Sequence, residues 1–357
     1  MKVLLLSRYG PLGASSRVRF LQYLPYFSSQ GIDMAVKPLF SDAYVQALYS
    51  GNSKWKEVVK GYFYRLFLLF TARKYDLVII EKELFPFMPA LAERFLRIIR
   101  VPYLVDYDDA IFHNYDRHKN PVVRRLLGKK IDTVMRLSSA VTVGNSYLAE
   151  RANKAGAIKA EIIPTVIDAE RYQCQREATP EVITVGWIGT PQTSRYLKPL
   201  LPVFESLQKK YSVRFVAIGA NANDFVGTPV EAWPWTEITE VSSIQQLDIG
   251  IMPLTDSPWE RGKCGYKLIQ YMACAIPVVA SPVGVNCEIV REGENGMLAG
   301  SIDEWSSALD AMLKAGPERL EEMGRVGRKS VDDWYSLNRQ KSRFLEVMRE
   351  SLKGSLS

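Results

Sequence analysis

The sequence predicts an α/β protein built from two doubly wound, Rossmann-like domains. Its 357 residues are too many for one ordinary core and fit two domains of about 150 to 200 residues each. Short apolar runs alternate with helical segments, which is typical of parallel sheets covered by helices on both faces. The alternation starts again after Asp168, so the second half is expected to adopt the architecture of the first.

We predict a first domain over residues 1–168, a linker over 169–181 and a second domain over 182–335, followed by a C-terminal segment over 336–357. The expected strands are Lys2–Ser7, Met34–Pro38, Leu77–Glu81, Tyr103–Tyr107, Ala140–Gly144 and Glu161–Pro164, then Val182–Ile188, Val213–Ile218, Asp248–Pro253, Val278–Ser281 and Met297–Ala299. A charged amphipathic helix over 337–351 is expected to pack back on the domain junction. Ligands of such sheets bind outside the carboxyl ends of the strands.

Composition limits the classes of partner. The net charge of +7 suits nucleic acid, anionic lipid or phosphorylated small molecules, but no nucleic-acid module is visible and the basic residues are spread along the chain. No apolar run reaches the roughly 18 to 20 residues that span a bilayer, and the chain opens on a strand rather than a signal peptide. We therefore expect a cytoplasmic protein. The cysteines, Cys174, Cys264, Cys274 and Cys287, lack CxxC spacing, so reduced thiols and no zinc are expected.

One segment suggests a membrane surface. Residues 54–73, KWKEVVKGYFYRLFLLFTAR, mix basic, aromatic and aliphatic side chains, as in helices that lie at a lipid interface. The alternative is an ordinary helix that covers a sheet. The first interpretation predicts peripheral contact with the anionic cytoplasmic face of a membrane.

The stretch over residues 262–284 predicts an anion site. A glycine-containing loop with Lys263 leads into a short helix that carries Lys267. The backbone N–H groups of a first helical turn point along a dipole worth roughly half a positive charge, so phosphate or diphosphate is the natural ligand. Lys267 and Gln270 are three residues apart and are expected to share a face. The alternative is that both lysines are solvated surface residues.

These motifs also resemble a known family. The block MACAIPVVASPVGVNCEIVREGENGMLA, residues 272–299, is similar to the donor-site signature of family 4 glycosyltransferases of the GT-B fold. VGWIGT at 185–190, DIGIMPL at 248–254, GASSRVR at 13–19 and IPTVID at 163–168 extend the resemblance over essentially the whole chain.

The resemblance implies two domains that face a central cleft. It also implies a metal-independent hexosyltransferase that uses a nucleotide-diphosphate sugar as co-substrate, needs no cofactor and retains the anomeric configuration. The most similar subgroup builds bacterial surface polysaccharides such as lipopolysaccharide on lipid-linked or saccharide acceptors. Two alternatives stay open: a relative that acts on the nucleotide sugar alone, as an epimerase does, and a non-catalytic nucleotide-sugar binding protein.

The resemblance places the donor in the second domain. The residues it implies there are Gly189, Thr190, Lys263, Gly265, Tyr266, Lys267, Gln270, Gly284 and Glu288. The sequence departs from the family pattern, because Gly262 and Gln270 stand where two glutamates are usual and Trp187 stands at a basic position. Gln270 would then bond a ribose hydroxyl through its amide, Glu260 is the candidate to replace the other glutamate, and Arg195 would assist the two lysines.

The first domain is expected to present the acceptor. Asp106, Asp108 and Asp109 follow a strand and precede His113. Alone, Asp106-Tyr107-Asp108 matches the DxD motif of metal-dependent transferases. Because the donor signature lies in the other domain, we interpret these residues as facing the acceptor, with Asp108 or Asp109 orienting the attacking hydroxyl and His113 stabilising charge or moving a proton. Capping and packing are the alternative.

Two further groups have open interpretations. Gly13, Ser15, Ser16 and Arg17 follow the first strand and would contact the acceptor in the resembled family, whereas Arg17 and Arg19 are alternatively ordinary charges on a helix surface. Trp233 and Trp235 either stack on a nucleotide base or pack at an edge.

Overall fold

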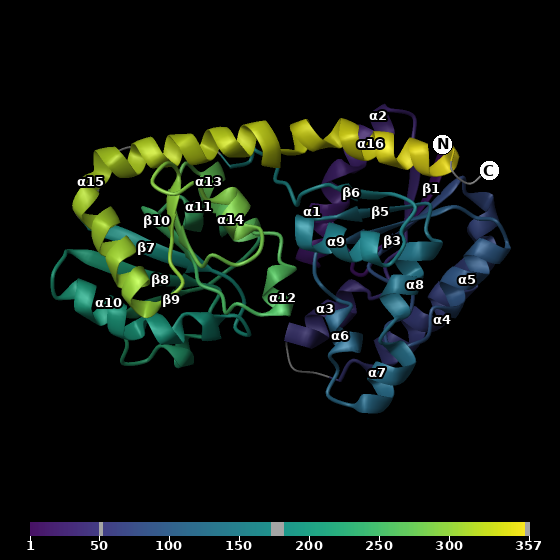
Figure 1. Ribbon diagram of the computed structural model, residues 1–357, viewed down its shortest axis with the longest axis horizontal. Coiled ribbons are helices and arrows are strands. Elements are labelled where there is room, and N and C mark those ends of the chain that lie inside the picture. The colour runs from purple at the N-terminus through teal and green to yellow at the C-terminus, as the bar shows by residue number, and fades with distance from the viewer. Residues whose placement is uncertain (50–52, 173–181, 354–357) are drawn as a thin grey trace. The chain divides into compact units, whose positions relative to one another are not determined.

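The computed structural model describes residues 1–49, 53–172 and 182–353. Most of the predicted linker, with Cys174, lies outside these residues. The chain divides into two compact units: the first comprises Met1–Val166, Gly262–Cys264 and Leu337–Ser357, and the second comprises Ile167–Arg261 and Gly265–Ser336. Each unit contains its own parallel sheet with helices packed on it (Figure 1).

The sheet of the first unit has the strand order β2-β1-β3-β4-β5-β6, with all neighbours parallel. Its strands are β1 (Lys2–Leu6), β2 (Asp33–Val36), β3 (Leu77–Glu81), β4 (Tyr103–Tyr107), β5 (Ala140–Val143) and β6 (Ala160–Ile162). These strands confirm the six predicted ones with small shifts at the ends. The strand order reverses direction between β1 and β3, which is the point where doubly wound sheets bind ligands.

The helices described in the first unit are α1 (Ala14–Arg19), α2 (Leu24–Ser29), α3 (Asp42–Tyr49), α4 (Trp55–Thr71), α5 (Leu91–Ile98), α6 (His113–Asp116), α7 (Pro121–Leu127), α8 (Lys130–Leu137), α9 (Ser146–Lys154) and α16 (Leu337–Lys353). The last of these confirms the predicted C-terminal helix. Phe344 of α16 packs edge-on against Tyr23, with ring centroids 5.2 Å apart, and joins the core formed by Val3 and Leu5 of β1. The end of the chain is therefore part of the first unit.

The second sheet has the order β12-β11-β10-β7-β8-β9, again all parallel. Its strands are β7 (Ile183–Ile188), β8 (Val213–Ile218), β9 (Val230–Trp233), β10 (Ile249–Met252), β11 (Val278–Ala280) and β12 (Gly296–Leu298). The order reverses between β7 and β10. Sequence reasoning missed β9, because this edge strand is only four residues long and contains Glu231.

The described helices of the second unit are α10 (Leu201–Gln208), α11 (Glu240–Ile244), α12 (Pro258–Arg261), α13 (Tyr266–Ala273), α14 (Asn286–Ile289) and α15 (Ile302–Ser330). Alternating strand residues bury two separate cores, one containing Trp187 with α10 and α15 and the other containing Ile188 with α13 and α14. Ser301 caps the start of α15, and its side chain accepts the N–H of Glu304 in a capping box. Over the described ranges, no helix combines the length and apolar character needed to cross a membrane.

Candidate functional site

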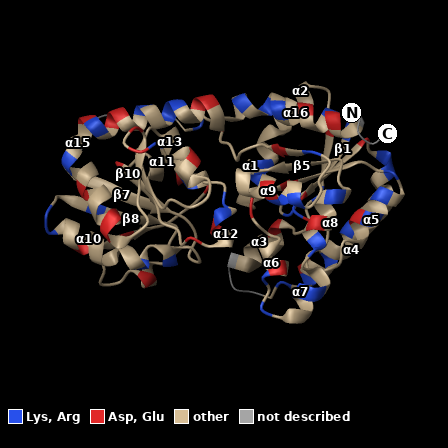
Figure 2. Cartoon of the chain, in the orientation of Figure 1, with Lys and Arg blue, Asp and Glu red and all other residues tan. Residues whose placement is uncertain are grey.

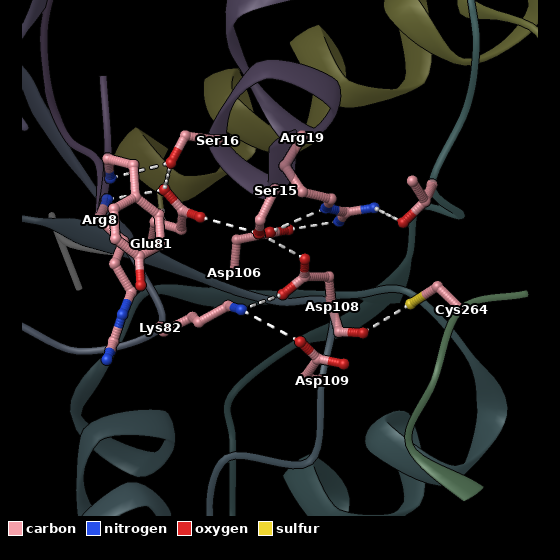
Figure 3. Close-up of polar contacts among 12 residues, drawn as sticks. Arg8, Ser15, Ser16, Arg19, Glu81, Lys82, Asp106, Asp108, Asp109 and Cys264 are labelled. Atoms are coloured by element: carbon pink, nitrogen blue, oxygen red, sulfur yellow. Dashed lines mark hydrogen bonds and ion pairs between the residues drawn. The ribbon is translucent and has the colours of Figure 1, made fainter. Parts of the chain in front are cut away.

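The first candidate site is a group of charged side chains where β1, β3 and β4 end, here called the carboxylate cluster (Figure 3). Its members are Ser15, Ser16, Arg19, Glu81, Lys82, Asp106, Asp108 and Asp109. The parallel strands bring their carboxyl ends to one edge of the sheet, and the loop after β1 carries α1 to the same edge. The cluster thus lies at the reversal of strand order, where ligand sites are expected.

Asp106 and Arg19 form a buried ion pair inside this cluster. Arg19 donates from Nε at 2.9 Å and from Nη2 at 2.5 Å to the two carboxylate oxygens, and Thr142 donates a further bond of 2.6 Å. Asp106 is only 1% exposed. The prediction that Asp106 faces a ligand is therefore wrong, and so is the alternative of Arg19 as a surface charge, because each neutralises the other in the interior.

Asp108 and Asp109 share a single buried cation. The Nζ of Lys82 lies 2.8 Å from Asp108 Oδ1 and 3.2 Å from Asp109 Oδ2. Burial alone would raise the pKa of Asp108, yet the attraction of Lys82, helped by a bond from Ser15, lowers that pKa to about 2. Lys82 has the left-handed φ of 68°. Asp109, whose side chain is 33% exposed, is the more accessible of the two carboxylates.

The start of α1 is joined to the end of β3. The Ser16 hydroxyl donates to Glu81 at 2.6 Å and is buried, whereas the Ser15 hydroxyl lies 2.6 Å from Asp108 Oδ2 and 3.1 Å from Glu81 Oε1. The structure therefore corrects the prediction for Ser16, which holds the helix in place. A Cβ on Gly13 would stand 2.2 Å from the Cβ of Tyr9, so this turn requires glycine. Arg17 donates to the Pro11 carbonyl at 3.1 Å.

His113 is engaged through both ring nitrogens. Nδ1 lies 2.8 Å from Asp116 and Nε2 lies 2.9 Å from the Tyr147 hydroxyl. Burial lowers its pKa despite the neighbouring carboxylate. The ring is therefore held by Asp116 and Tyr147. Among the described residues, its hydrogen bonds run to these two side chains rather than to the carboxylate cluster.

Residues Gly262–Cys264 belong to the first unit and pack against the cluster. The Cys264 thiol donates to the Asp108 carbonyl at 2.8 Å, and the Asn145 side chain donates to the Lys263 carbonyl at 2.9 Å. A Cβ on Gly262 would lie 2.4 Å from the Cβ of Ala110. The chain passes too close to Ala110 for any side chain at position 262, which is the physical reason for glycine where the resembled family has glutamate.

The second candidate site is formed by α13 and the loop after β7 in the second unit. The Nζ of Lys267 lies 4.3 Å from the ring centroid of Trp187, and a Cβ on Gly189 would stand 2.9 Å from that same Nζ. Trp187 is fully buried, and its indole N–H is one of the few buried polar groups, over the described residues, with no hydrogen-bond partner. We call Gly189, Trp187, Lys267 and the first turn of α13 the cationic turn.

Glycine is required where α13 begins. Gly265, the residue before the helix, has φ 64°, and a Cβ there would lie 2.3 Å from a methyl group of Ile289. The left-handed turn directs the chain into the helix, whose first N–H groups are not used by its own hydrogen-bond ladder. Tyr266 is half-buried and packs against the core that contains α13. Thr190 is exposed, and its backbone N–H and hydroxyl both lie within hydrogen-bond distance of the Thr193 hydroxyl.

Gln270 lies inside the second unit rather than beside Lys267. It is 3% exposed, and its amide donates to the Tyr172 hydroxyl at 3.0 Å. Tyr172 donates to Glu240 at 2.8 Å, and Trp235 donates to the other oxygen of Glu240 at 3.0 Å. The prediction that Gln270 and Lys267 reach toward one ligand is therefore wrong, because Gln270 completes an internal chain of hydrogen bonds.

The other donor candidates differ in accessibility. Glu260 is buried and accepts hydrogen bonds from Tyr196 and Ser257, so it does not replace the missing glutamate at the surface. Gly284 has φ 55° and lies against the Arg261 backbone, while Glu288 on α14 is exposed.

Sequence reasoning missed Glu81 and Lys82. Both follow the apolar strand LVII directly, which is the signal that singled out Asp106 on the next strand. Trp235 lies near the cationic turn, because a Cβ on Gly219 would contact both the Gly189 carbonyl at 2.3 Å and the Cβ of Trp235 at 3.1 Å. Trp233 lies at the sheet edge under the Arg214 guanidinium.

The chain is similar to glycosyltransferases of known sequence. A family model described as glycosyl transferases group 1 matches residues 179–315. The chain is 23% identical over 243 residues to the putative teichuronic acid biosynthesis glycosyltransferase TuaH of Bacillus subtilis, covering 61% of this chain and 59% of TuaH. It is 42% identical over 66 residues to D-inositol 3-phosphate glycosyltransferase of Gordonia bronchialis, covering 18% of this chain and 14% of that protein. The matches thus span less than two thirds of both relatives.

Solved structures show the same fold over nearly the whole chain. Sucrose-phosphate synthase from Thermosynechococcus elongatus has a TM-score of 0.70 at 13% identity and covers 98% of both chains. HepE of Anabaena, solved in complex with UDP-glucose, has a TM-score of 0.64 at 16% identity and covers 97% of this chain and 99% of its own. The family model, the relatives and the shared fold together support the predicted resemblance to family 4 glycosyltransferases of the GT-B fold.

Proposed function

We propose that the protein is a retaining glycosyltransferase that moves a sugar from a nucleotide-diphosphate donor to a lipid-linked or saccharide acceptor in cell-surface polysaccharide synthesis. The cationic turn is the observation that carries this proposal. Lys267 and the first turn of α13 are groups that bind a diphosphate. The indole of Trp187 lies under Lys267 and has a buried N–H with no protein partner among the described residues.

These groups favour departure of the sugar. When the glycosidic bond breaks, negative charge grows on the diphosphate, and a fixed cation and helix dipole stabilise that charge more strongly than they stabilise the intact donor. The proposed reaction uses no metal, since the cationic turn itself balances the charge. With no nucleophilic side chain assigned beside the turn, attack of the acceptor from the face of the leaving group accounts for retention.

The acceptor hydroxyl is assigned to the carboxylate cluster. Asp109 is its most accessible carboxylate, and Lys82 together with Ser15 keeps neighbouring Asp108 ionised. A hydroxyl that donates to Asp109 is oriented and made more nucleophilic as its proton moves toward the carboxylate. Lys82, bound to both acids, acts as a positioning residue.

The relatives support the chemical class of the substrates. HepE was solved with UDP-glucose, and TuaH is named for teichuronic acid biosynthesis. UDP-sugars are therefore the first donors to test, and a surface polysaccharide is the proposed product. We place the reaction at the cytoplasmic face of a membrane, where lipid-linked acceptors are accessible.

Calorimetric titration of the full chain with nucleoside diphosphates and their sugars tests the donor site. Lys267→Ala is expected to weaken binding by between about tenfold and a hundredfold, the value of a hydrogen bond to a charged group, and Lys267→Arg is expected to retain part of it. Lys329→Ala, an exposed residue of α15, serves as the matched control. Equal affinity of wild type and Lys267→Ala would refute the diphosphate assignment.

A non-catalytic nucleotide-sugar binding protein is the second candidate. It is favoured by the packing of Gly262 against Ala110 and by the burial of Gln270, which leave both family glutamate positions without an accessible acid. Release of nucleoside diphosphate only with a lipid-linked acceptor present indicates transfer. Donor binding without release indicates the binding protein, and conversion of the sugar without an acceptor indicates an epimerase.

A further inference from the structure

Helix α4 places its aromatic residues outward and its arginine inward. Arg65 is 1% exposed and donates to the Ser7 carbonyl at 2.7 Å and the Lys37 carbonyl at 3.1 Å. Phe63, Phe67 and Phe70 are 71%, 63% and 71% exposed. A helix that only covered a sheet would show the opposite pattern, so the outer face of α4 is suited to an apolar medium.

The apolar face continues onto α5 and the loop before it. A groove of about 410 Å³ lies between the two helices, lined by Tyr62, Leu66 and Phe70 of α4, by Leu91 and Phe95 of α5, and by Met88. Phe70 and Phe95 meet edge to face across it, with ring centroids 6.2 Å apart. Nearly half of the exposed large apolar side chains in the described ranges lie between Trp55 and Ile98, and such a gathering marks an interaction surface.

The exposed charges of these helices are basic. Lys56, Lys60, Arg94 and Arg97 are exposed, and Arg73, Lys74 and Arg100 lie exposed just beyond the helix ends; blue segments mark both helices in Figure 2. The acidic residues of α4 and α5 offset only one of them, because Glu57 pairs with Lys60 at 3.0 Å and Glu93 is buried. Aromatic residues among basic ones match the boundary between acyl chains and anionic head groups.

We propose that the face formed by α4 and α5 binds the surface of an anionic lipid bilayer, with Phe63, Phe67 and Phe70 at the level of the upper acyl chains and the basic residues at the phosphates. A protein partner would satisfy the apolar groove equally well, but the near absence of exposed acids over two helices favours a uniformly anionic surface. The inference uses the outer face of the first unit alone, so it stands apart from the proposed sugar transfer.

Vesicle flotation with the full chain tests this proposal. Wild type is expected to float with vesicles in which phosphatidylglycerol replaces part of the phosphatidylcholine, and to bind pure phosphatidylcholine far less. Phe63→Ser/Phe67→Ser is expected to lower the partition coefficient by at least about tenfold, and Arg94→Gln/Arg97→Gln by about fivefold for each charge. Trp334→Ser/Ile238→Ser, which removes two exposed apolar side chains of the second unit, and Arg325→Gln/Lys329→Gln on α15 are the matched controls.

The results distinguish a bilayer from other binding partners of the face formed by α4 and α5. Loss of flotation in the α4 and α5 variants with unchanged controls supports the bilayer, and a retained circular dichroism spectrum and thermal midpoint show that those variants are folded. Failure of wild type to float with anionic vesicles overturns the proposal, as does equal binding by wild type and the phenylalanine variant. A wild-type dimer in sedimentation that Phe63→Ser/Phe67→Ser dissociates would identify the face as a contact between copies instead. Donor titration is measured separately, so failure of one proposal leaves the other unaffected.

Discussion

The carboxylate cluster and the cationic turn are built on opposite principles. In the first unit, Arg19 pairs with Asp106 and Lys82 with Asp108 and Asp109, so the two cations of the cluster are bound by its own acids. In the second unit, Lys267 lies on an aromatic ring beside Gly189, and a buried indole N–H has no protein acceptor over the described residues.

The difference indicates what each site binds. The carboxylate cluster binds its own cations and presents Asp109, its more accessible acid, as a hydrogen-bond acceptor, which suits a hydroxyl. The cationic turn offers an ammonium group and helix N–H donors, which suit an anion. Substitutions in the first site should therefore affect folding first, and substitutions in the second should affect ligand binding first.

The largest expected effect is on stability. Asp106→Ala leaves Arg19 buried without its counterion, which is expected to cost about 3 to 5 kcal/mol in the free energy of unfolding. Urea denaturation followed by circular dichroism measures this cost. The control is Glu150→Ala, which removes an exposed ion pair with Lys154 in one helix and is expected to cost less than about 1 kcal/mol. If folded Asp106→Ala also lost donor affinity, the first site would affect ligand binding as well as folding, and the proposed difference between the two sites would be wrong.

The next effect is a pH dependence. The pKa of Asp108 is about 2 in the folded protein and about 3.9 in an unfolded chain, so its stabilisation is present above pH 4 and is lost as the pH falls toward 2. Wild type is expected to lose about 2 kcal/mol more than Asp108→Asn over that interval. Parallel stability profiles of the two proteins would show that Lys82 does not hold Asp108 ionised.

A smaller effect is expected at the segment that packs against the cluster. Gly262→Ala places a methyl group 2.4 Å from the Cβ of Ala110, and the overpacking is expected to cost about 1 to 3 kcal/mol of unfolding free energy. Gly262→Glu, which introduces the family residue, should cost at least as much and should not raise transfer activity. Gly300→Ala, whose Cβ would meet the carboxylate of Glu304 at 3.3 Å and Pro282 at an ordinary contact distance of 3.5 Å, is the control. Thermal denaturation measures the stability of all three variants.

The smallest expected effect is a loss of donor affinity on substitution of Trp187 in the cationic turn. Trp187→Phe removes the indole N–H that has no protein acceptor among the described residues, so donor affinity should fall by about fivefold, or about 1 kcal/mol. Trp305→Phe makes a similar deletion in the same core and should leave donor affinity unchanged while costing comparable stability. Equal donor affinities in the two variants would remove Trp187 from the proposed phosphate site.

The fold was largely predictable because its signals are local. An apolar run between turn residues predicts a buried parallel strand whatever surrounds it, and this rule located all the strands except β9. The same rule places polar residues such as Asp106 and Glu81 at the carboxyl ends of strands. It does not say which of them stay accessible.

The pairing of the site residues was not predictable in the same way. Arg19 and Asp106 are 87 residues apart, and nothing in either segment alone states that they meet. Gln270 illustrates the same limit, since its position three residues after Lys267 predicts a shared face, but Tyr172 binds its amide from a distant segment.

By itself, the sequence determined two parallel α/β sheets, the glycine-bounded turn before α13 and the resemblance to a glycosyltransferase family, because these depend on neighbouring residues. The tertiary structure decided that Asp106 is neutralised, that Lys82 holds Asp108 and Asp109, and that Gln270 is internal. It also decided that the phenylalanines of α4 point outward while Arg65 points inward. Burial and pairing arise when distant segments pack together, so only the folded chain specifies which charges remain for a ligand.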